Sequence, residues 1–71
     1  MIQVIKVDDQ KASEIIEQRE PRGKFYTISE VDGKKIYVGI DNYSGDAWTE
    51  DFKSLGSCKR WLGGGETWLF L

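Results

Sequence analysis

The order of apolar and polar positions predicts first a strand and then a helix. The segment "IQVIKV" (Ile2–Val7) is short and rich in β-branched residues, which favours a strand. From Asp9 onward the apolar residues recur about every 3.6 positions, as on one side of a helix. One stripe of this predicted helix carries Ala12, Ile15, Ile16 and Arg19. Asp8 or Asp9 can cap its start through a carboxylate, and Pro21 ends it.

The next block, "KFYTISEVDGKKIYVGID", predicts a hairpin around Asp32-Gly33, a dipeptide that tolerates the positive φ angles of a tight turn. Two registers fit the pattern. A two-residue loop pairs Ser29 with Ile36 and puts on one face Phe25, Val31, Ile36, Val38 and Ile40. A three-residue loop ending at Gly33 pairs Ile28 with Ile36 and gathers on one face Tyr26, Ile28, Ile36, Val38 and Ile40. We expect the second register, because it places more aliphatic side chains on one side of the sheet.

The segment "DNYSGDAWTEDF" (Asp41–Phe52) combines a turn with a third strand of the meander. Asp, Asn, Ser and Gly gather at its start, which is typical of an Asx-type turn, and the rest resumes an extended pattern with Trp48 and Phe52 on one face. Ser54 can cap a second helix. One stripe of that helix carries Leu55, Cys58, Trp61 and Leu62. Three glycines then end it, and the final "ETWLFL" predicts a last strand over Trp68–Leu71.

These elements predict a single α+β domain over residues 1–71, with the order β-α-β-β-β-α-β. Its centre is a small antiparallel sheet formed by a three-stranded meander. The terminal strands, Ile2–Val7 and Trp68–Leu71, are candidates for extending that sheet. We expect one helix, or both, to lie across its apolar face.

Composition narrows the class of protein. Hydrophobic residues make up 39% of the chain and charged residues 31%, as in an ordinary globular domain. The single Cys58 excludes a disulfide within the chain and favours a reducing compartment. No apolar run at the start has the length of a signal peptide, and no stretch approaches the roughly 20 apolar residues of a membrane span. We therefore expect a cytoplasmic protein with no membrane partner.

The sequence offers no set of residues for catalysis, for a metal or for a cofactor. Histidine is absent, which removes the commonest general base and metal ligand. The acidic loop has Asp41, Tyr43 and Gly45 at alternate positions, so it lacks the oxygen ligands of a helix–loop–helix calcium site. Cys58 lies on an apolar stripe, where a thiol is usually inert. We expect that the protein is not an enzyme and binds neither a metal nor a cofactor.

Charge is distributed unevenly along the chain. The formal net charge is −2, yet residues 41–51 hold four acids and no base, whereas residues 21–40 and 52–71 each carry a net charge of +2. A chain that is acidic overall lacks the usual footprint of a nucleic-acid binder. Local basic residues near sheet tyrosines nevertheless make nucleic-acid binding the alternative function. Its contacts would be Tyr26, Lys24, Lys34, Lys35, Lys59 and Arg60.

The aromatic content carries the leading functional hypothesis. Three Trp, three Tyr and three Phe are more rings than one sheet–helix interface in so short a chain should cover. Trp and Tyr concentrate the binding energy of protein interfaces. We therefore predict a small non-enzymatic interaction module that binds a protein partner through an aromatic-rich sheet face. The predicted contacts are Tyr37, Tyr43, Trp48, Trp68 and Phe70. A second copy of the chain, bound through the C-terminal strand, is one candidate partner.

Overall fold

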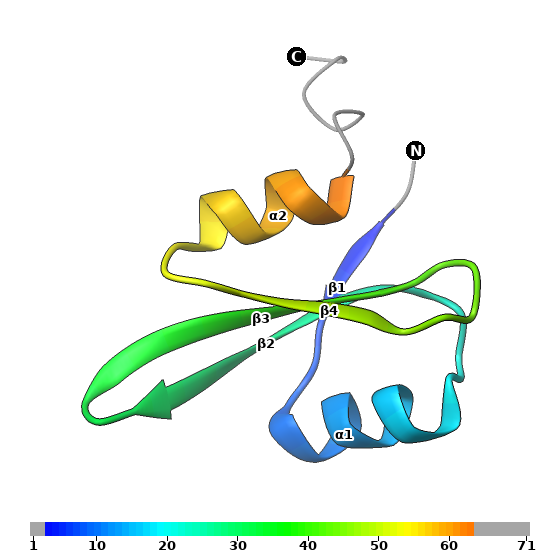
Figure 1. The fold of residues 1–71 in the computed structure, drawn as a ribbon, viewed down its shortest axis with the longest axis horizontal. Coiled ribbons are helices and arrows are strands. Elements are labelled where there is room, and N and C mark those ends of the chain that lie inside the picture. The colour runs from blue at the N-terminus through cyan, green and yellow to red at the C-terminus, as the bar shows by residue number, and fades with distance from the viewer. Residues whose placement is uncertain (1–2, 64–71) are drawn as a thin grey trace.

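The computed structural model describes residues 3–63, which form a four-stranded sheet between two helices (Figure 1). The strands stand in the order in which they occur in the chain: β1 (Val4–Lys6), β2 (Gly23–Val31), β3 (Lys34–Asn42) and β4 (Trp48–Phe52). β1 runs parallel to β2, and the other two pairs are antiparallel. α1 (Asp9–Gln18) connects β1 to β2, and α2 (Leu55–Gly63) follows β4. The predicted α+β class and the order β-α-β-β-β-α are confirmed, and the predicted strand Trp68–Leu71 lies outside the described residues.

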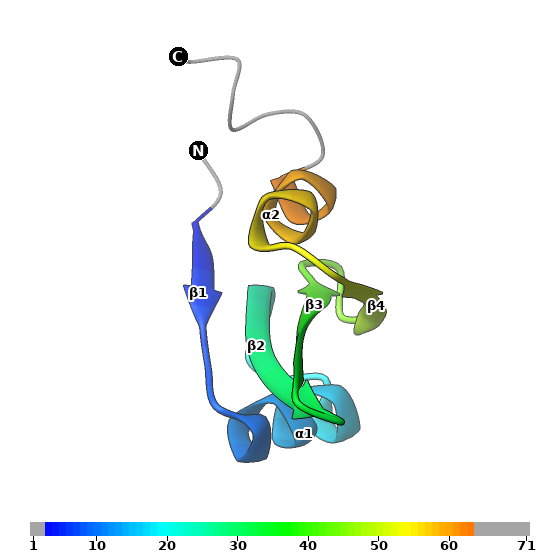
Figure 2. The same cartoon turned by 90° about the vertical axis from the view of Figure 1, so that its left-hand side faces the viewer.

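The two helices cover opposite faces of the sheet. Figure 1 shows α2 above the strands and α1 below them, and Figure 2 shows the same three layers from the side. The sequence left open whether one helix or both would lie across a single apolar face, and in the structure each helix has a face of its own. The sheet has two apolar faces, because successive residues of each strand point to opposite sides and each side meets its own helix.

α1 begins and ends where local chemistry places its caps. The Lys11 backbone N–H donates to Asp8 Oδ1 at 2.7 Å, which confirms Asp8 as the cap. Of the predicted stripe, Ala12 and Ile15 are buried against Phe25 and Ile40. Ile16 and Arg19 were wrongly assigned to the inner side. Ile16 is 40% exposed, because the helix contacts the sheet along a single narrow line. Arg19 is the C-cap of the helix and has the left-handed conformation, with φ +59°.

The β2–β3 hairpin has the two-residue loop, so the expected three-residue register is wrong by one position. Ser29 pairs with Ile36, and Asp32 and Gly33 have φ angles of +53° and +76°, as the tight turn requires. Phe25 packs against α1, whereas Tyr26, Ile28 and Tyr37 pack on the α2 side. Collecting the aliphatic side chains on one face brings no advantage once both faces are covered.

α2 follows the predicted pattern. Ser54 caps the helix, with its Oγ accepting from the Ser57 backbone N–H at 3.2 Å. The predicted stripe faces the sheet, and two of its members, Cys58 and Leu62, are fully buried. The rings of Phe52 and Trp61 meet with centroids 5.6 Å apart. Gly39 of β3 lies under this layer, and a Cβ at that position would approach the Trp61 ring to 3.1 Å.

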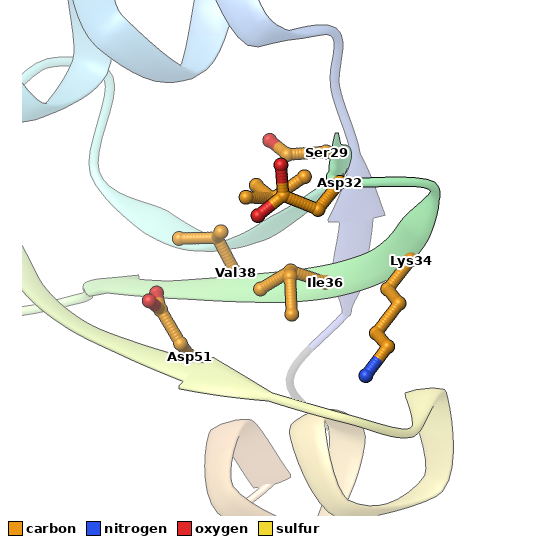
Figure 3. Close-up of a pocket in the computed structure, with 7 residues that line it drawn as sticks. Ser29, Asp32, Lys34, Ile36, Val38 and Asp51 are labelled. Carbon is orange, nitrogen blue, oxygen red and sulfur yellow. The ribbon is translucent and has the colours of Figure 1, made fainter.

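α1 leaves part of its face of the sheet open. Beyond the N-terminal end of α1, where the Ser29 hydroxyl donates to Asp9, a groove of about 560 Å³ under the hairpin is lined by Val31, Ile36 and Val38. Its polar rim consists of Ser29, Asp32, Lys34 and Asp51 (Figure 3). Val31 is 55% exposed, which is unusual for a side chain of this kind within a strand. The expected register did not predict this groove, because it placed Val31 in the loop and not on the face that carries Ile36 and Val38.

Candidate protein-interaction surface

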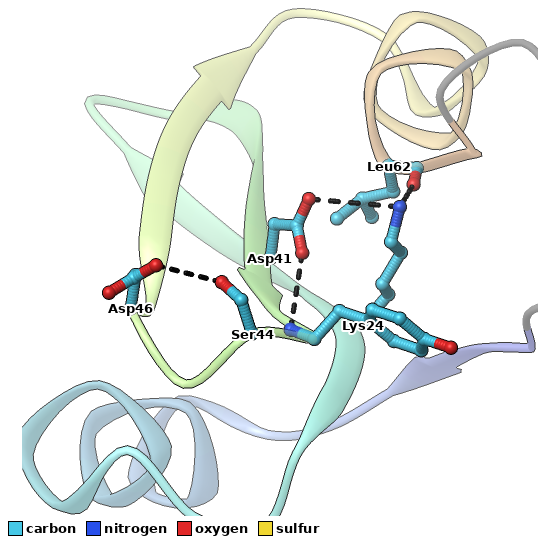
Figure 4. Close-up of polar contacts among 6 residues, drawn as sticks. Lys24, Asp41, Ser44, Asp46 and Leu62 are labelled. Carbon is cyan, nitrogen blue, oxygen red and sulfur yellow. Dashed lines mark hydrogen bonds and ion pairs between the residues drawn. The ribbon is translucent and has the colours of Figure 1, made fainter.

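The loop between β3 and β4 is held in shape by its own side chains. Asp41 Oδ1 accepts from the Tyr43 backbone N–H at 3.2 Å, which confirms the predicted Asx-type turn. Ser44 Oγ donates to Asp46 Oδ2 at 2.8 Å (Figure 4). Gly45 has a φ of +90°, a conformation that favours glycine at this position. The acidic segment is therefore an ordered turn with two of its carboxylates already hydrogen-bonded.

A buried amide fixes the base of this loop. Asn42 is fully buried, and its Nδ2 donates to the Pro21 carbonyl at 2.8 Å, whereas its Oδ1 accepts from the Ala47 backbone N–H at 3.1 Å. The guanidinium of Arg22 lies over Gly45, where an added Cβ would be 3.0 Å from its Nε. The loop is thus attached to the segment before β2, and nothing in the sequence pattern singled out Asn42 for this role.

Lys24 joins the loop to the end of α2. Its side chain is buried, its ammonium donates to the Leu62 carbonyl, and its Nζ is 3.7 Å from Asp41 Oδ2 (Figure 4). The same Nζ is 6.0 Å from the centre of the Tyr43 ring, at the limit of a cation–π contact. The ammonium of Lys24, a predicted nucleic-acid contact, therefore interacts with groups of the fold itself and lies on one side of the Tyr43 ring.

Most rings of the described chain are covered by helices. Phe25 is buried by α1, and the α2 side of the sheet contains Tyr26, Tyr37, Phe52 and Trp61. The aromatic sheet face that the sequence predicted as a binding surface is thus a helix–sheet interface, with Tyr37 half-buried in it. Two predicted contacts are exposed: Tyr43 at 58% and Trp48 at 65%. Trp68 and Phe70 lie outside the described residues.

Trp48 lies on an acidic surface of the outer strand of the sheet, and Tyr43 lies in the loop before that strand, with its ring near the ammonium of Lys24. β4 pairs with β3 on one side, and its first four residues are exposed. We call this strand surface and the loop before it the acidic edge; it consists of Tyr43, Ser44, Asp46, Trp48, Thr49, Glu50 and Asp51. It contains three carboxylates and no base, and Lys53 is the first cation after it in the chain. An exposed indole on the same face of β4 as the Glu50 carboxylate, with the Asp51 carboxylate on the opposite face, is the chemically distinctive feature of this surface.

The remaining predicted nucleic-acid contacts do not form one surface. Tyr26 is covered by α2, and the ammonium of Lys59 is 5.9 Å from the centre of its ring. Lys34 and Lys35 are exposed at the turn of the hairpin, and their side chains point to opposite faces of the sheet. Arg60 is exposed on α2. A base therefore cannot stack on Tyr26 as predicted, because α2 covers its ring.

Other kinds of chemistry find little support within residues 3–63. No group of three or more carboxylate or thiol side chains lies together there as metal ligands would. Burial raises the pKa of the Cys58 thiol above its ordinary value, and the nearby Lys59 opposes this only in part. The described helices are too short and too polar to cross a bilayer.

Comparisons of the chain with protein-family models, with curated proteins and with solved structures found no match. The surface itself is therefore the basis on which a function can be inferred. The acidic edge contains the two most exposed rings of the described chain and three carboxylates, and internal hydrogen bonds hold the loop that carries Tyr43.

Proposed function

We propose that the protein is a non-enzymatic interaction module that binds a protein partner through the acidic edge. The observation that carries this proposal is the exposure of Trp48 and Tyr43, at 65% and 58%. Trp and Tyr are the side chains that most often dominate the free energy of protein association. Their burial by a partner would remove a large apolar area from water.

The fixed shape of the loop supports the same proposal. Association loses free energy when it must order side chains and loops, so a surface that is already ordered binds more tightly for the same contacts. Asn42 and Lys24 anchor the loop from beneath, and the Lys24 ammonium lies 6.0 Å from the centre of the Tyr43 ring. The rings are thus presented by a rigid support, as in preorganised binding surfaces.

Selection from a random peptide library displayed on phage tests this proposal and does not require the partner to be identified first. We expect ligands selected on the unmodified protein to lose at least about tenfold in affinity for the Tyr43→Ala/Trp48→Ala variant, which corresponds to about 1.4 kcal/mol. The matched control is Ile5→Ala/Ile16→Ala, which removes two other exposed apolar side chains. Its affinities should stay within about threefold of the unmodified protein, since hot-spot residues are few.

Two results would overturn the proposal. One is a selection that enriches no ligand above an uncoated support. The other is a set of ligands that bind the Tyr43→Ala/Trp48→Ala variant as tightly as the unmodified protein. Both variants should keep the unmodified circular dichroism spectrum, because all four side chains are exposed and contribute little to the core.

A second candidate function, nucleic-acid binding, has one observation in its favour. The segment 53–63 carries Lys53, Lys59 and Arg60 and no acidic residue, and all three bases are exposed. Neutralising phosphates with such residues releases counterions, so the affinity should fall steeply with salt. An electrophoretic shift with single- or double-stranded DNA or RNA at about 50 mM salt, abolished by Lys59→Glu/Arg60→Glu, would favour this function. No shift under these conditions would exclude it.

A further inference from the structure

We propose that the partner segment is a basic, extended strand that pairs with β4 as a fifth strand of the sheet. This inference rests on the proposed function and specifies the chemistry and the mode of binding at the acidic edge. Extended peptides commonly bind by adding a strand to an exposed sheet edge, where backbone hydrogen bonds provide affinity and alternate side chains provide specificity.

The backbone of β4 is suited to such pairing. Five consecutive residue pairs join β4 to β3 without a bulge, from Asp41–Trp48 to Tyr37–Phe52. Natural edge strands are commonly protected by charged side chains, by Pro or by a bulge; Trp48–Phe52 has no Lys, Pro or bulge, and its protection consists of the carboxylates of Glu50 and Asp51. Figure 2 shows α1 and α2 over the faces of the sheet and neither of them along the outer side of β4. Within residues 3–63, the outer side of β4 is therefore open to another strand.

The charges of β4 favour a partner strand that is basic. Glu50 points to the α2 side together with Phe52, and Asp51 points to the α1 side, where it lines the groove. An added strand would thus meet a carboxylate on either face. Arg22 and Lys24 are the nearest bases of the loop: the Arg22 guanidinium lies over Gly45, and the Lys24 ammonium donates to the Leu62 carbonyl and pairs with Asp41. Lys or Arg at successive central positions of the partner would pair with Glu50 and Asp51.

The same charges disfavour a second copy of the chain as the added strand. If two β4 strands paired around their centres, Glu50 and Asp51 of one copy would lie opposite or diagonal to the same residues of the other. Like charges directly opposite each other destabilise a sheet. The carboxylates of β4 therefore act against self-association and in favour of a partner of opposite charge.

Side chains on either face of β4 give the partner further contacts. On the α2 side, Trp48 offers an exposed indole, the ring on which Arg or Lys is held best by a cation–π contact. On the α1 side, Asp51 pairs across the strand boundary with Val38, which begins the apolar floor of the groove. An arginine beside Asp51 could lay its aliphatic stem over Val38 and keep its guanidinium at the carboxylate.

The experiment uses the peptides selected on the unmodified protein, synthesised and labelled for fluorescence anisotropy. We expect the selected set to be rich in Arg, Lys and β-branched residues. Glu50→Lys/Asp51→Lys should weaken their binding at least about tenfold and should allow an octapeptide of alternating glutamate and valine to bind instead. The control variant, Glu14→Lys/Glu17→Lys, makes the same charge change on α1, and its effect should stay within about threefold because exposed charges at a distance are screened.

Amide hydrogen exchange, followed by NMR, tests the mode of binding. Saturation with a selected peptide should slow the exchange of the outward-facing amides of β4 by about tenfold or more, because they become hydrogen-bonded to the added strand. The amides on the exposed side of α1 should exchange as before. Analytical ultracentrifugation of the unmodified protein should give a monomer.

The outcomes separate the inference from the proposed function. If the ligands require Tyr43 and Trp48 but are not basic, ignore the charge reversal or leave the β4 amides unprotected, the inference is overturned and the interaction module stands. A dimer that forms through β4 also overturns it. If no ligand requires Tyr43 and Trp48, the proposed function and the inference fall together.

Discussion

Replacing Gly39 by alanine tests the closest contact between α2 and the sheet. Gly39 is buried in the middle of β3, and a Cβ there would lie 3.1 Å from two carbons of the Trp61 indole and 3.2 Å from Cys58 Sγ. A shift of the indole would also disturb its contact with the Phe52 ring, 5.6 Å from it between centroids. The added methyl group must therefore push α2 away from β3 by a few tenths of an ångström.

The expected loss follows from two opposing effects. Overpacking a well-packed interior costs about 1–3 kcal/mol. Replacing glycine by alanine in a compatible backbone stabilises by about 0.4–1 kcal/mol, chiefly by restricting the unfolded chain. The overpacking is larger, so Gly39→Ala should lower the free energy of unfolding by about 1–2 kcal/mol. For a domain of this size, each kcal/mol corresponds to a fall in melting temperature of about 4–8 °C.

Gly56→Ala is the matched control, because the chemical change is identical and the surroundings are empty. Gly56 is exposed in α2, and no atom lies within 4 Å of an added Cβ. This variant should gain about 0.4–1 kcal/mol, since alanine also favours the helix. Urea denaturation followed by tryptophan fluorescence measures both. If Gly39→Ala is as stable as Gly56→Ala, the Trp61 ring does not rest on β3 and the described packing of α2 is wrong.

The further predictions concern three buried residues. Asn42→Ala should lower the free energy of unfolding in urea by about 1–3 kcal/mol, because it leaves its backbone partners unpaired. Lys24→Met should cost about 1–3 kcal/mol, whereas Lys35→Met on the exposed hairpin should cost less than about 0.5 kcal/mol. The Cys58 thiol should react with a thiol reagent at least about tenfold more slowly in native protein than in urea. Because burial raises the pKa of Cys58, its contribution to stability is present below about pH 8.5 and is lost above it, so alkaline destabilisation should be smaller in Cys58→Ala.

The sequence predicted those parts of the fold that depend on neighbouring residues. Asp8 and Ser54 cap their helices through side-chain oxygens three positions from the N–H groups that donate to them, so the pattern alone identified Ser54 and narrowed the other cap to Asp8 or Asp9. The inner stripe of α2 was equally clear, because Gly63 bounds a helix with four apolar positions at helical spacing. Local chemistry is sufficient for these features.

The hairpin register depended on information that local chemistry does not contain. Both registers place β-branched residues in strands, and they differ in which side chains share a face. The choice between them required knowing that α1 covers Phe25 and Ile40 while α2 covers Tyr26 and Tyr37. The same omission led to an overestimate of the free aromatic surface from the sequence. α2 alone covers Tyr26, Tyr37 and Phe52 with its own Trp61, and α1 covers Phe25, so that Tyr43 and Trp48 are the rings left exposed in the described chain.

The lengths of the elements explain where open surface remains. At about 1.5 Å per residue, the ten residues of α1 span about 15 Å and the nine of α2 about 13.5 Å. The nine-residue strands of the hairpin span about 30 Å at roughly 3.3 Å per residue. Neither helix can therefore cover the whole face of the sheet on which it lies. The outer strand, β4, also has no neighbouring strand on its outer side within residues 3–63. The groove beside Asp51 lies on the part of the sheet that α1 leaves uncovered, and the exposed Trp48 lies on the outer strand. Both features border β4. A partner strand on β4 would contact both Trp48 and Asp51 at the rim of the groove, and for this reason the edge is a better binding site than either feature taken alone.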